Sequence, residues 1–559
     1  MNLFTVIPFL YTVLNTQQQE QQPVYLALKQ HNIDVLEKVV NDISNPISEN
    51  YGKVMKMNEI VDIISPTYQE QQKVISWISE YNISDIKNYG DNIKFQTSKD
   101  KIRQMFNIST KELYNYTIPY HLRDIIDFVE MSLYKVPRNI KINNKSPLKT
   151  TDDRYFGREP MMYLYNVSDI SLNKSISGAS IEYQNNCGFI NNDLTKQQVM
   201  NGQIVNILND VVGPNVDIDV ESSLDVQMMS QTGNNAKLWF WDTPIWLYSF
   251  AVDFYNTPDI PDVISMSWGW SQANQCNIVD CSNLTSLQYV NRVNIEYMKI
   301  VLRGTTMTVS SGDAGAPGRT NEECDVNNPI NPVFPGSSPF VVSVGATYTD
   351  KTNKTRDYKS PLCLNNACIT DNNEKSISFD HVGWTAGGGF DLTRNSTPWW
   401  QKSVVEEYLN SGVQLPPDTN FNRNGRAYPD VSAIGHSCPT YINGQLGGVD
   451  GTSCSSPVVA GLLTIIKEHL WKTKKIKIGH INPLLYYIYD KCPSCYRDIT
   501  EGYNWCTEET CSSNTTYFGF NATHGFDPVS GLGTLNVGNI LWFIENKLEN
   551  KGTLNVEYI

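Results

Sequence analysis

The chain has 559 residues, which is long enough for more than one domain, because single hydrophobic cores stop growing near about 300 residues. Hydrophobic residues make up 40% and charged residues 18%, a globular composition that can bury a sizeable core. The formal net charge of −14 argues against nucleic acid as a partner and fits an acidic compartment, where protonated carboxylates would bring the charge toward neutral.

The N-terminus is apolar and uncharged. The run Leu3–Leu14 has the length of a signal-peptide core and is too short to span a bilayer. No Lys or Arg precedes it, so a buried N-terminal strand or helix is the alternative. We expect a signal peptide over residues 1–16, and no later stretch is long enough for a membrane helix.

Residues 17–140 differ from the rest of the chain. They contain no cysteine, and apolar residues recur at helical spacing. This spacing predicts helices over Tyr25–Ile43, Glu59–Ile64 and Glu70–Tyr81. The polar stretch 141–154 has no periodicity and is typical of a linker. We therefore expect a separate N-terminal domain joined to the remainder by this linker.

From residue 155 to residue 559, apolar strand-like runs alternate with helical stretches. Strands are expected over Val216–Val220, Val263–Trp268, Thr306–Ser310, Phe340–Val344 and Gln445–Val449. Helices are expected over Ser222–Ser230, Tyr289–Val301 and Ser455–Leu470. This alternation predicts an α/β domain with a parallel sheet and helices on both faces.

The chain contains twelve cysteines, none of them before Cys187. Those that lie close together in sequence are Cys276 and Cys281, Cys363 and Cys368, and the group Cys492, Cys495, Cys506 and Cys511. The last group could form a zinc site, but behind a signal peptide disulfides are the better interpretation. Cys454 is expected to be a free, buried thiol. Glycosylation sequons, among them Asn82 and Asn395, also fit the secretory route.

The segment Gly451–Pro457 joins a predicted strand to a predicted helix and contains Ser453. A serine at a helix N-terminus exposes its hydroxyl, and nearby backbone N–H groups can hold an oxyanion. Pro457 fits the first helical turn, where its missing donor costs nothing. Ser453 is therefore a candidate nucleophile, and the alternative is an ordinary N-cap serine.

A nucleophilic serine needs a base. No histidine lies in a His-Gly-Thr-His context and no Asp-Ser/Thr-Gly ends a first strand, which argues against a Ser-His-Asp triad of the subtilisin type. Glu221 and Asp225 are the alternative, because their spacing places both on one helix face. If they are buried, one must hold its proton more tightly, so Glu221 could accept the serine proton while Asp225 orients it. The other interpretation is a solvated acidic face.

A third acid follows the strand expected over Thr306–Ser310. Asp313 lies in a glycine-rich loop at the carboxyl edge of that strand, where sites in α/β domains assemble. A protonated acid there can donate a hydrogen bond to an oxyanion. The alternative is an aspartate that serves only the turn.

Together, Glu221-x-x-x-Asp225, Ser311-Gly312-Asp313 and Gly451-Thr452-Ser453 resemble the motifs of the sedolisin family of serine-carboxyl peptidases. The flanking segments that also resemble the family are Ser48–Lys53, Pro335–Thr347, Gly387–Phe390 and Arg426–Ala433. The resemblance runs from about residue 25 to about residue 545. Within the family, the chain is most similar to the lysosomal tripeptidyl-peptidases.

The resemblance implies a subtilisin-like α/β fold preceded by an α+β prodomain, and an acid peptidase made as a self-activating proenzyme. Carried over by motif, Ser453 attacks the carbonyl and Glu221 is the general base. Asp225 orients Glu221, and Asp313 stabilises the oxyanion beside the backbone N–H of Ser453. Because Asp313 must be protonated while Glu221 must accept a proton, these needs coexist only at low pH.

The resemblance also implies the substrate and the location. The expected reaction is release of tripeptides from the free N-terminus of polypeptides, with the prodomain as intramolecular inhibitor and the lysosome or the extracellular space as the destination. The alternatives are an acid endopeptidase of the same family, a catalytically inactive peptide-binding relative, and a neutral Ser-His-Asp hydrolase.

A structural calcium ion near the C-terminus is implied as well. Asp498 and Asp527 would give carboxylates, and Ile499, Thr523 and Gly525 would give backbone carbonyls, a hard-oxygen set that suits Ca²⁺. Thr523 stands where the family commonly has Gly. The alternative is two ordinary loop aspartates.

Two positions near the candidate nucleophile depart from the family's pattern. Asp450 stands where a small residue is usual, and Cys454 replaces the common Ala. Neither change removes a candidate catalytic group, but Asp450 can perturb the pKa values of its neighbours.

Overall fold

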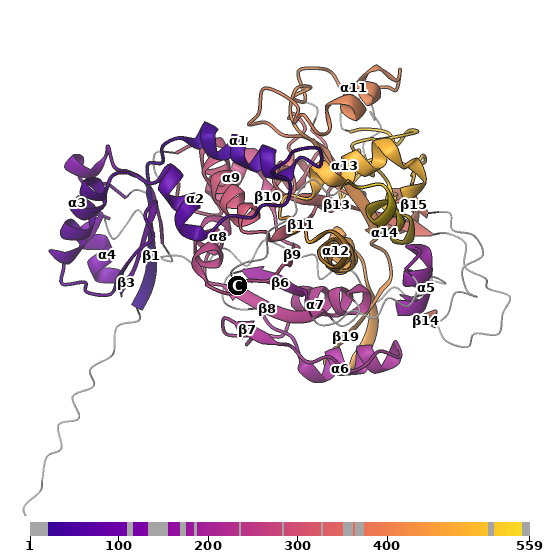
Figure 1. The fold of residues 1–559 in the computed structure, drawn as a ribbon, viewed down its shortest axis with the longest axis horizontal. Helices are drawn as coiled ribbons and strands as arrows, with labels where there is room; N and C mark the ends of the chain where they lie inside the picture. The colour runs from indigo at the N-terminus through magenta and orange to yellow at the C-terminus, as the bar shows by residue number, and fades with distance from the viewer. Residues whose placement is uncertain are drawn as a thin grey trace, which may run out of the picture.

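The computed structural model describes residues 21–108, 116–131, 155–167, 175–183, 187–233, 236–281, 284–325, 328–349, 362–363, 374–511 and 519–549. The expected signal peptide (1–16) and linker (141–154) lie outside these residues. The described residues form a small N-terminal domain and a large α/β domain packed against it (Figure 1).

The N-terminal domain is built on an antiparallel sheet with the strand order β2-β3-β1-β4. Its strands are β1 (Gln21–Leu28), β2 (Ile86–Asn88), β3 (Asn92–Ser98) and β4 (Ile126–Met131). Its helices are α1 (Ile33–Ser44), α2 (Met57–Ile64), α3 (Tyr68–Ser79) and α4 (Lys99–Met105). The helices α2 and α3 confirm those expected over Glu59–Ile64 and Glu70–Tyr81.

The helix expected over Tyr25–Ile43 is wrong in its first part. Tyr25, Leu26, Ala27 and Leu28 are fully buried in β1, which pairs with β3 on one side and β4 on the other. A central strand explains why every residue of this run is apolar. The helix begins only at Ile33, and its residue Val35, expected on the buried face, is 42% exposed.

The α/β domain contains a large sheet whose strands are mostly parallel. In spatial order, the parallel strands are β22 (Thr534–Leu535), β18 (Val431–Ile434), β13 (Val342–Thr349), β11 (Thr306–Ser310), β9 (Val263–Met266), β6 (Ser177–Tyr183), β8 (Lys237–Thr243) and β7 (Asp210–Val212). The antiparallel additions are β21 (Tyr496–Arg497), beside β22, and β15 (Glu374–Ser376), beside β13. The parallel sheet predicted from the sequence is therefore confirmed.

Helices cover both faces of this sheet (Figure 1). One face packs against α7 (Val220–Thr232), α12 (Thr452–Lys474), α13 (Asn482–Lys491) and α14 (Val537–Asn546). The other face packs against α8 (Leu247–Asn256) and α9 (Ser286–Leu302). The helix α12 is buried along most of its length because it crosses β9, β11, β13 and β18 as well as α7.

Shorter elements complete the α/β domain. The helices are α5 (Arg158–Leu164), α6 (Asn191–Met200), α10 (Phe379–Val382) and α11 (Lys402–Asn410). The strands are β5 (Tyr155–Phe156), β10 (Trp270–Ser271), β12 (Val333–Phe334), β14 (Leu362–Cys363), β16 (Gly389–Phe390), β17 (Ala427–Tyr428), β19 (Cys438–Ile442) and β20 (Gln445–Val449).

Most of the predicted elements of this domain are present, and one is wrong. The segment Val216–Val220 is not a strand: it forms a single bridge, from Ile218 to Gly188, and Val220 already begins α7. Among the described residues, that bridge is its only strand-like pairing, so the segment forms no continuous ladder with a neighbouring strand. The strand over 445–449 is one arm of the hairpin β19–β20 rather than part of the parallel sheet.

The N-terminal domain docks on α9 through α1 and α2, while α3 and α4 lie on its far side (Figure 1). A buried ion-pair cluster crosses this interface. Lys299 of α9 binds Asp91 at 2.8 Å and Glu296 at 2.6 Å, and all three side chains are fully buried. Separating the two domains would leave buried charges without their partners, so this cluster favours the docked arrangement.

Disulfides bridge several of the closely spaced cysteines. The described pairs are Cys276–Cys281, Cys438–Cys454, Cys492–Cys495 and Cys506–Cys511. The prediction of a free thiol at Cys454 is wrong, because the hairpin β19–β20 brings Cys438 next to the start of α12. Cys368 lies outside the described residues. Disulfides of this number are typical of oxidising compartments. Among the described helices, none is long and apolar enough to cross a membrane.

Candidate active site

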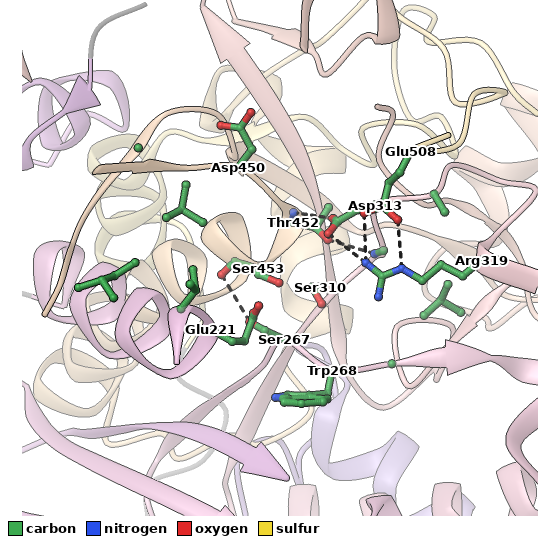
Figure 2. A pocket seen from close by; sticks show the side chains of 18 of the residues that line it. Glu221, Ser267, Trp268, Ser310, Asp313, Arg319, Asp450, Thr452, Ser453 and Glu508 are labelled. Carbon is green, nitrogen blue, oxygen red and sulfur yellow. Dashed lines mark hydrogen bonds and ion pairs between the residues drawn. The ribbon is translucent and has the colours of Figure 1, made fainter. Parts of the chain in front are cut away.

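A pocket of about 480 Å³ opens where the carboxyl ends of β9 and β11 meet the N-termini of α7 and α12 (Figure 2). Ser267 and Trp268 follow β9, and Asp313 follows β11. Glu221 and Ser453 enter the same pocket from the first turns of the two helices. Residues that are far apart in the sequence therefore meet at one edge of the sheet.

Ser453 is the second residue of α12 and is 7% exposed at the wall of the pocket. The turn before it depends on Gly451, whose φ of 146° is one that other residues rarely adopt. The helix begins three residues earlier than expected, so Pro457 lies in its second turn and not in its first. Pro457 cannot donate to the carbonyl of Ser453, and that carbonyl instead accepts a hydrogen bond from the Ser267 hydroxyl at 3.4 Å.

Glu221 accepts a hydrogen bond from the Ser453 hydroxyl (Figure 2). The Glu221 side chain is buried, which excludes the interpretation of a solvated acidic face. Burial raises the pKa of Glu221 to about 8, against the opposing effect of the Ser453 hydroxyl. A base with a raised pKa in contact with a serine hydroxyl is suited to take the proton of that hydroxyl.

Asp225 lies one helical turn after Glu221 and is fully buried. One of its oxygens accepts a hydrogen bond from the Ser267 hydroxyl at 2.8 Å. Burial raises the pKa of Asp225 well above its ordinary value, and the charge of Glu221 raises it further. Glu221 Oε1 and Asp225 Oδ2 are buried and have no hydrogen-bond donor among the described residues. Two such oxygens on adjacent acids are best satisfied by protons, so the pair holds at least one proton in acid.

A third buried acid, Glu182 on β6, stands behind this pair and was not predicted. It accepts a hydrogen bond from the Trp268 indole N–H at 2.7 Å. Burial raises its pKa well above the ordinary value, and Asp225 has the largest effect among the acids that add to this shift. The only sequence signal is one acidic residue inside the apolar strand Ser177–Tyr183.

These buried acids should make the folded protein more stable in acid than at neutral pH. The folded state holds the last proton of the Glu221–Asp225 pair up to about pH 8, whereas an unfolded glutamate releases its proton near pH 4.3. The stabilisation is complete below the unfolded pKa and is lost as the pH rises toward 8. We expect Glu221→Gln to raise the melting temperature by a few degrees at pH 7.5 and to leave it nearly unchanged at pH 4.5. Calorimetry showing the same change at both pH values would contradict this account.

Asp313 faces the start of α12 from the opposite side of the pocket (Figure 2). Its Oδ1 accepts two hydrogen bonds from Thr452, from the backbone N–H at 2.8 Å and from the hydroxyl at 2.6 Å. These bonds fix the carboxyl beside the residue that precedes Ser453.

Arg319 and Glu508 line the same pocket and were not predicted. The Arg319 guanidinium binds both oxygens of Glu508 at 3.2 Å and approaches Asp313 Oδ2 at 3.7 Å (Figure 2). Glu508 comes from the loop between Cys506 and Cys511, 189 residues away in the sequence. No local sequence motif predicts the ion pair between Arg319 and Glu508.

Asp450 lies at the rim of the pocket, two residues before Thr452. Its carboxylate pairs with His436 Nδ1 at 3.0 Å and accepts a hydrogen bond from the Ser437 backbone N–H at 2.7 Å. The departure from a small residue is therefore accommodated by a partner on the preceding loop.

The five candidate calcium ligands come together on two neighbouring loops. The Gly525 N–H donates to Asp498 at 2.9 Å, and the Ser530 hydroxyl links the Ile499 carbonyl to Asp527. Asp527 is fully buried and accepts a hydrogen bond from the Thr523 N–H at 3.0 Å. Burial raises its pKa to about 7, so an ionised Asp527 gains from a cation. Among the described residues no three acidic, His or Cys side chains gather around one point, so backbone carbonyls would have to complete the site.

Comparisons with known proteins identify relatives of both parts of the chain. The activation domain of pro-kumamolisin matches residues 12–146, and the subtilase family matches residues 219–477. Physarolisin from Physarum polycephalum is 34% identical over 544 residues, covering 93% of each chain. Tripeptidyl-peptidase 1 from Mus musculus is 27% identical over 576 residues, covering 94% of this chain and 91% of that protein.

The solved structure of a Pseudomonas sedolisin, a serine-carboxyl proteinase complexed with pseudo-iodotyrostatin, shares the fold. It superposes with a TM-score of 0.52 at 22% identity, and covers 71% of this chain and 100% of that one. The activation-domain match covers the small N-terminal domain, and the subtilase match lies in the α/β domain that follows it.

Proposed function

This chain belongs to the sedolisin family of serine-carboxyl peptidases, and we infer that it is an acid peptidase with Ser453 as its nucleophile. The observation that carries this inference is the hydrogen bond from the Ser453 hydroxyl to the buried carboxyl of Glu221. Asp313 stands on the other side of Ser453, where an oxyanion donor is needed.

In the first step, Ser453 Oγ attacks the carbonyl carbon of the scissile peptide and its proton passes to Glu221. Asp225 holds Glu221 in place and supplies or withdraws a proton as the charge on the pair changes. The tetrahedral oxygen receives hydrogen bonds from the Ser453 N–H and from protonated Asp313. Glu221 then gives its proton to the leaving amine, and the same groups, with water as the nucleophile, hydrolyse the acyl-enzyme.

Acid pH suits this arrangement for two reasons. Asp313 can donate a hydrogen bond only when it carries a proton. The Glu221–Asp225 pair acts as a base when it carries one negative charge and one proton. The raised pKa values of the two carboxyls keep that proton bound over the acid range. Rates should therefore fall toward neutral pH.

We propose further that the substrate is the free N-terminus of a polypeptide and that the product is a tripeptide. The described lining residues of the pocket include Glu221, Asp313, Asp450 and Glu508 but only one lysine or arginine, Arg319. Asp450, at the rim and outside the catalytic group, is the acid of this lining that suits the ammonium group of a free N-terminus. The similarity to tripeptidyl-peptidase 1 over nearly the whole chain supports the same specificity.

The direct experiment uses a free and an N-terminally blocked Ala-Ala-Phe fluorogenic peptide at about pH 4, with Ser453→Ala as control. Cleavage of the free peptide alone supports the tripeptidyl activity. Cleavage of both peptides would make the protein an endopeptidase of the same family, and Ser453-independent cleavage would remove the proposed nucleophile.

We assign residues 17–140 to an activation prodomain, 141–154 to the linker that is cut and 155–559 to the peptidase. The match to an activation domain over residues 12–146 and the separate N-terminal sheet support a prodomain in this part of the chain. A signal peptide over residues 1–16 would direct the protein into the secretory pathway, toward the lysosome or out of the cell, and the disulfides fit that route.

We propose that Asp498 and Asp527, with the carbonyls of Ile499, Thr523 and Gly525, hold one structural Ca²⁺. The ion would fix two loops of the peptidase domain and has no part in the chemistry at Ser453. EGTA at pH 7 should lower the melting temperature of the unprocessed protein by several degrees, and added Ca²⁺ but not Mg²⁺ should restore it. Asp527→Asn should be insensitive to EGTA. An unchanged melting temperature with the chelator would dismiss the site.

A further inference from the structure

We propose that Arg319 and Glu508 act together as positioning residues for Asp313, and that their pairing sets the upper pH limit of catalysis. The proposal rests on the proposed role of Asp313 as a protonated donor. A cation beside such an acid favours its ionised form, which cannot donate. Arg319 therefore helps catalysis only if another group takes up its charge.

Glu508 is that group, and the distances show the preference. Arg319 places Nε and Nη2 on the two oxygens of Glu508, both at 3.2 Å, in the forked arrangement that suits a guanidinium and a carboxylate. Its contact with Asp313 is made through Nη2 alone, at the longer distance of 3.7 Å. The guanidinium thus directs its paired donors to Glu508 and only one edge toward Asp313 (Figure 2).

The three side chains form a compact group at the pocket wall. Arg319, Asp313 and Glu508 are 23%, 18% and 14% exposed, so solvent screens them only in part. The other charged groups that face them are Glu221, which acts on Arg319, and Glu322, which acts on Glu508. Both are acids, so among the residues that the structure describes no second cation competes for Glu508.

The ionisation of Glu508 supports this arrangement. Burial raises the pKa of Glu508 above its ordinary value, and Arg319 opposes that shift. The Arg319–Glu508 pair is neutral only when Glu508 is ionised, and the charge of Arg319 favours that form. In that form the neutral Arg319–Glu508 pair acts on Asp313 with less net charge than Arg319 alone would.

Two substitutions should shift the pH profile in opposite directions. In Glu508→Gln, Arg319 keeps its charge without compensation and favours the ionised form of Asp313. The pH above which kcat falls should move down by roughly one unit. In Arg319→Gln, Asp313 loses the cation and faces the acid Glu508 alone. The pH above which kcat falls, the alkaline limb of the profile, should therefore move up by roughly half a pH unit to one pH unit. The double substitution should return the limb close to its original position.

The experiment measures kcat for a tripeptide substrate from pH 3 to pH 7 in these three variants and in the original enzyme. A matched control is the exposed pair Arg423–Asp418, whose Arg423→Gln and Asp418→Asn variants should leave the profile unchanged. Ser453→Ala tests the proposed function separately, because it should abolish cleavage at every pH. Arg319→Lys keeps the charge without the fork and provides a second test if Arg319→Gln does not fold.

Opposite shifts of the two single variants would support the pairing, since a purely structural role lowers the rate without moving the limb. Shifts of both single variants in the same direction would overturn it. An unchanged alkaline limb would also overturn it, provided that the variants fold and the original enzyme is active. An inactive wild-type enzyme would instead count against the proposed function.

Discussion

Replacing Glu221 with Gln should lower kcat for peptide hydrolysis by roughly 10²- to 10⁴-fold, the range expected for loss of a general base. The amide occupies nearly the same volume and can still meet the Ser453 hydroxyl, but it cannot take up the serine proton. KM should change little, because Glu221 acts on the nucleophile and is not needed to hold the peptide. Steady-state kinetics at about pH 4 measure both constants.

The matched control is Glu406→Gln on α11, which makes the same chemical change on an exposed helix and should leave kcat unaltered. If Glu221→Gln stops self-processing, an added protease can remove the N-terminal domain before the assay. A properly folded Glu221→Gln enzyme that keeps more than a tenth of the activity would mean that another group accepts the proton.

Replacing Asp313 with Ala should cost at least about 100-fold in kcat, since one oxyanion donor is worth roughly 3–4 kcal/mol. The loss also frees the N–H and hydroxyl of Thr452, which now donate to Asp313 at 2.8 and 2.6 Å. Asp313→Asn is the more informative variant, because an amide donates at any pH. We expect Asn to recover part of the rate and to remove the decline of kcat toward neutral pH that depends on the Asp313 proton.

Measuring kcat from pH 3 to pH 7 for both variants decides the matter. Thr452→Ser keeps both hydrogen bonds to Asp313 and serves as a control for disturbance of the turn. An Asp313→Ala enzyme within tenfold of the original rate would exclude Asp313 from the oxyanion site. An unaltered decline in Asp313→Asn would assign the pH limit to another group.

The sequence was sufficient to predict where the candidate site lies. Ser453, Glu221 and Asp313 each stand in a short motif at the junction of a strand and a helix or loop. Parallel strands bring such junctions to one edge of the sheet, and the resemblance to the sedolisin motifs joined the three residues into one expected site. The alternation of strands and helices likewise predicted the α/β domain, because its buried strands read as continuous apolar runs.

Other features depend on tertiary contacts that leave no local pattern. Glu182 is a single acid in an apolar strand, and Arg319 and Glu508 are joined by a contact between loops that are 189 residues apart. Tyr25–Leu28 is apolar on both sides because it is a central strand, and its pattern merges with that of the following helix. The bond between Cys438 and Cys454 follows from the hairpin β19–β20, whose register no spacing rule supplies.

The most direct test of the central claim is cleavage of an unblocked Ala-Ala-Phe fluorogenic peptide at about pH 4 by the acid-activated protein, compared with Ser453→Ala. The account predicts cleavage by the original enzyme and loss of at least 10³-fold in the variant. Ser453→Ala should otherwise fold with the same far-UV spectrum. Equal cleavage by both proteins, or none by the original enzyme at any acid pH, would contradict the assignment of Ser453 as the nucleophile of an acid peptidase.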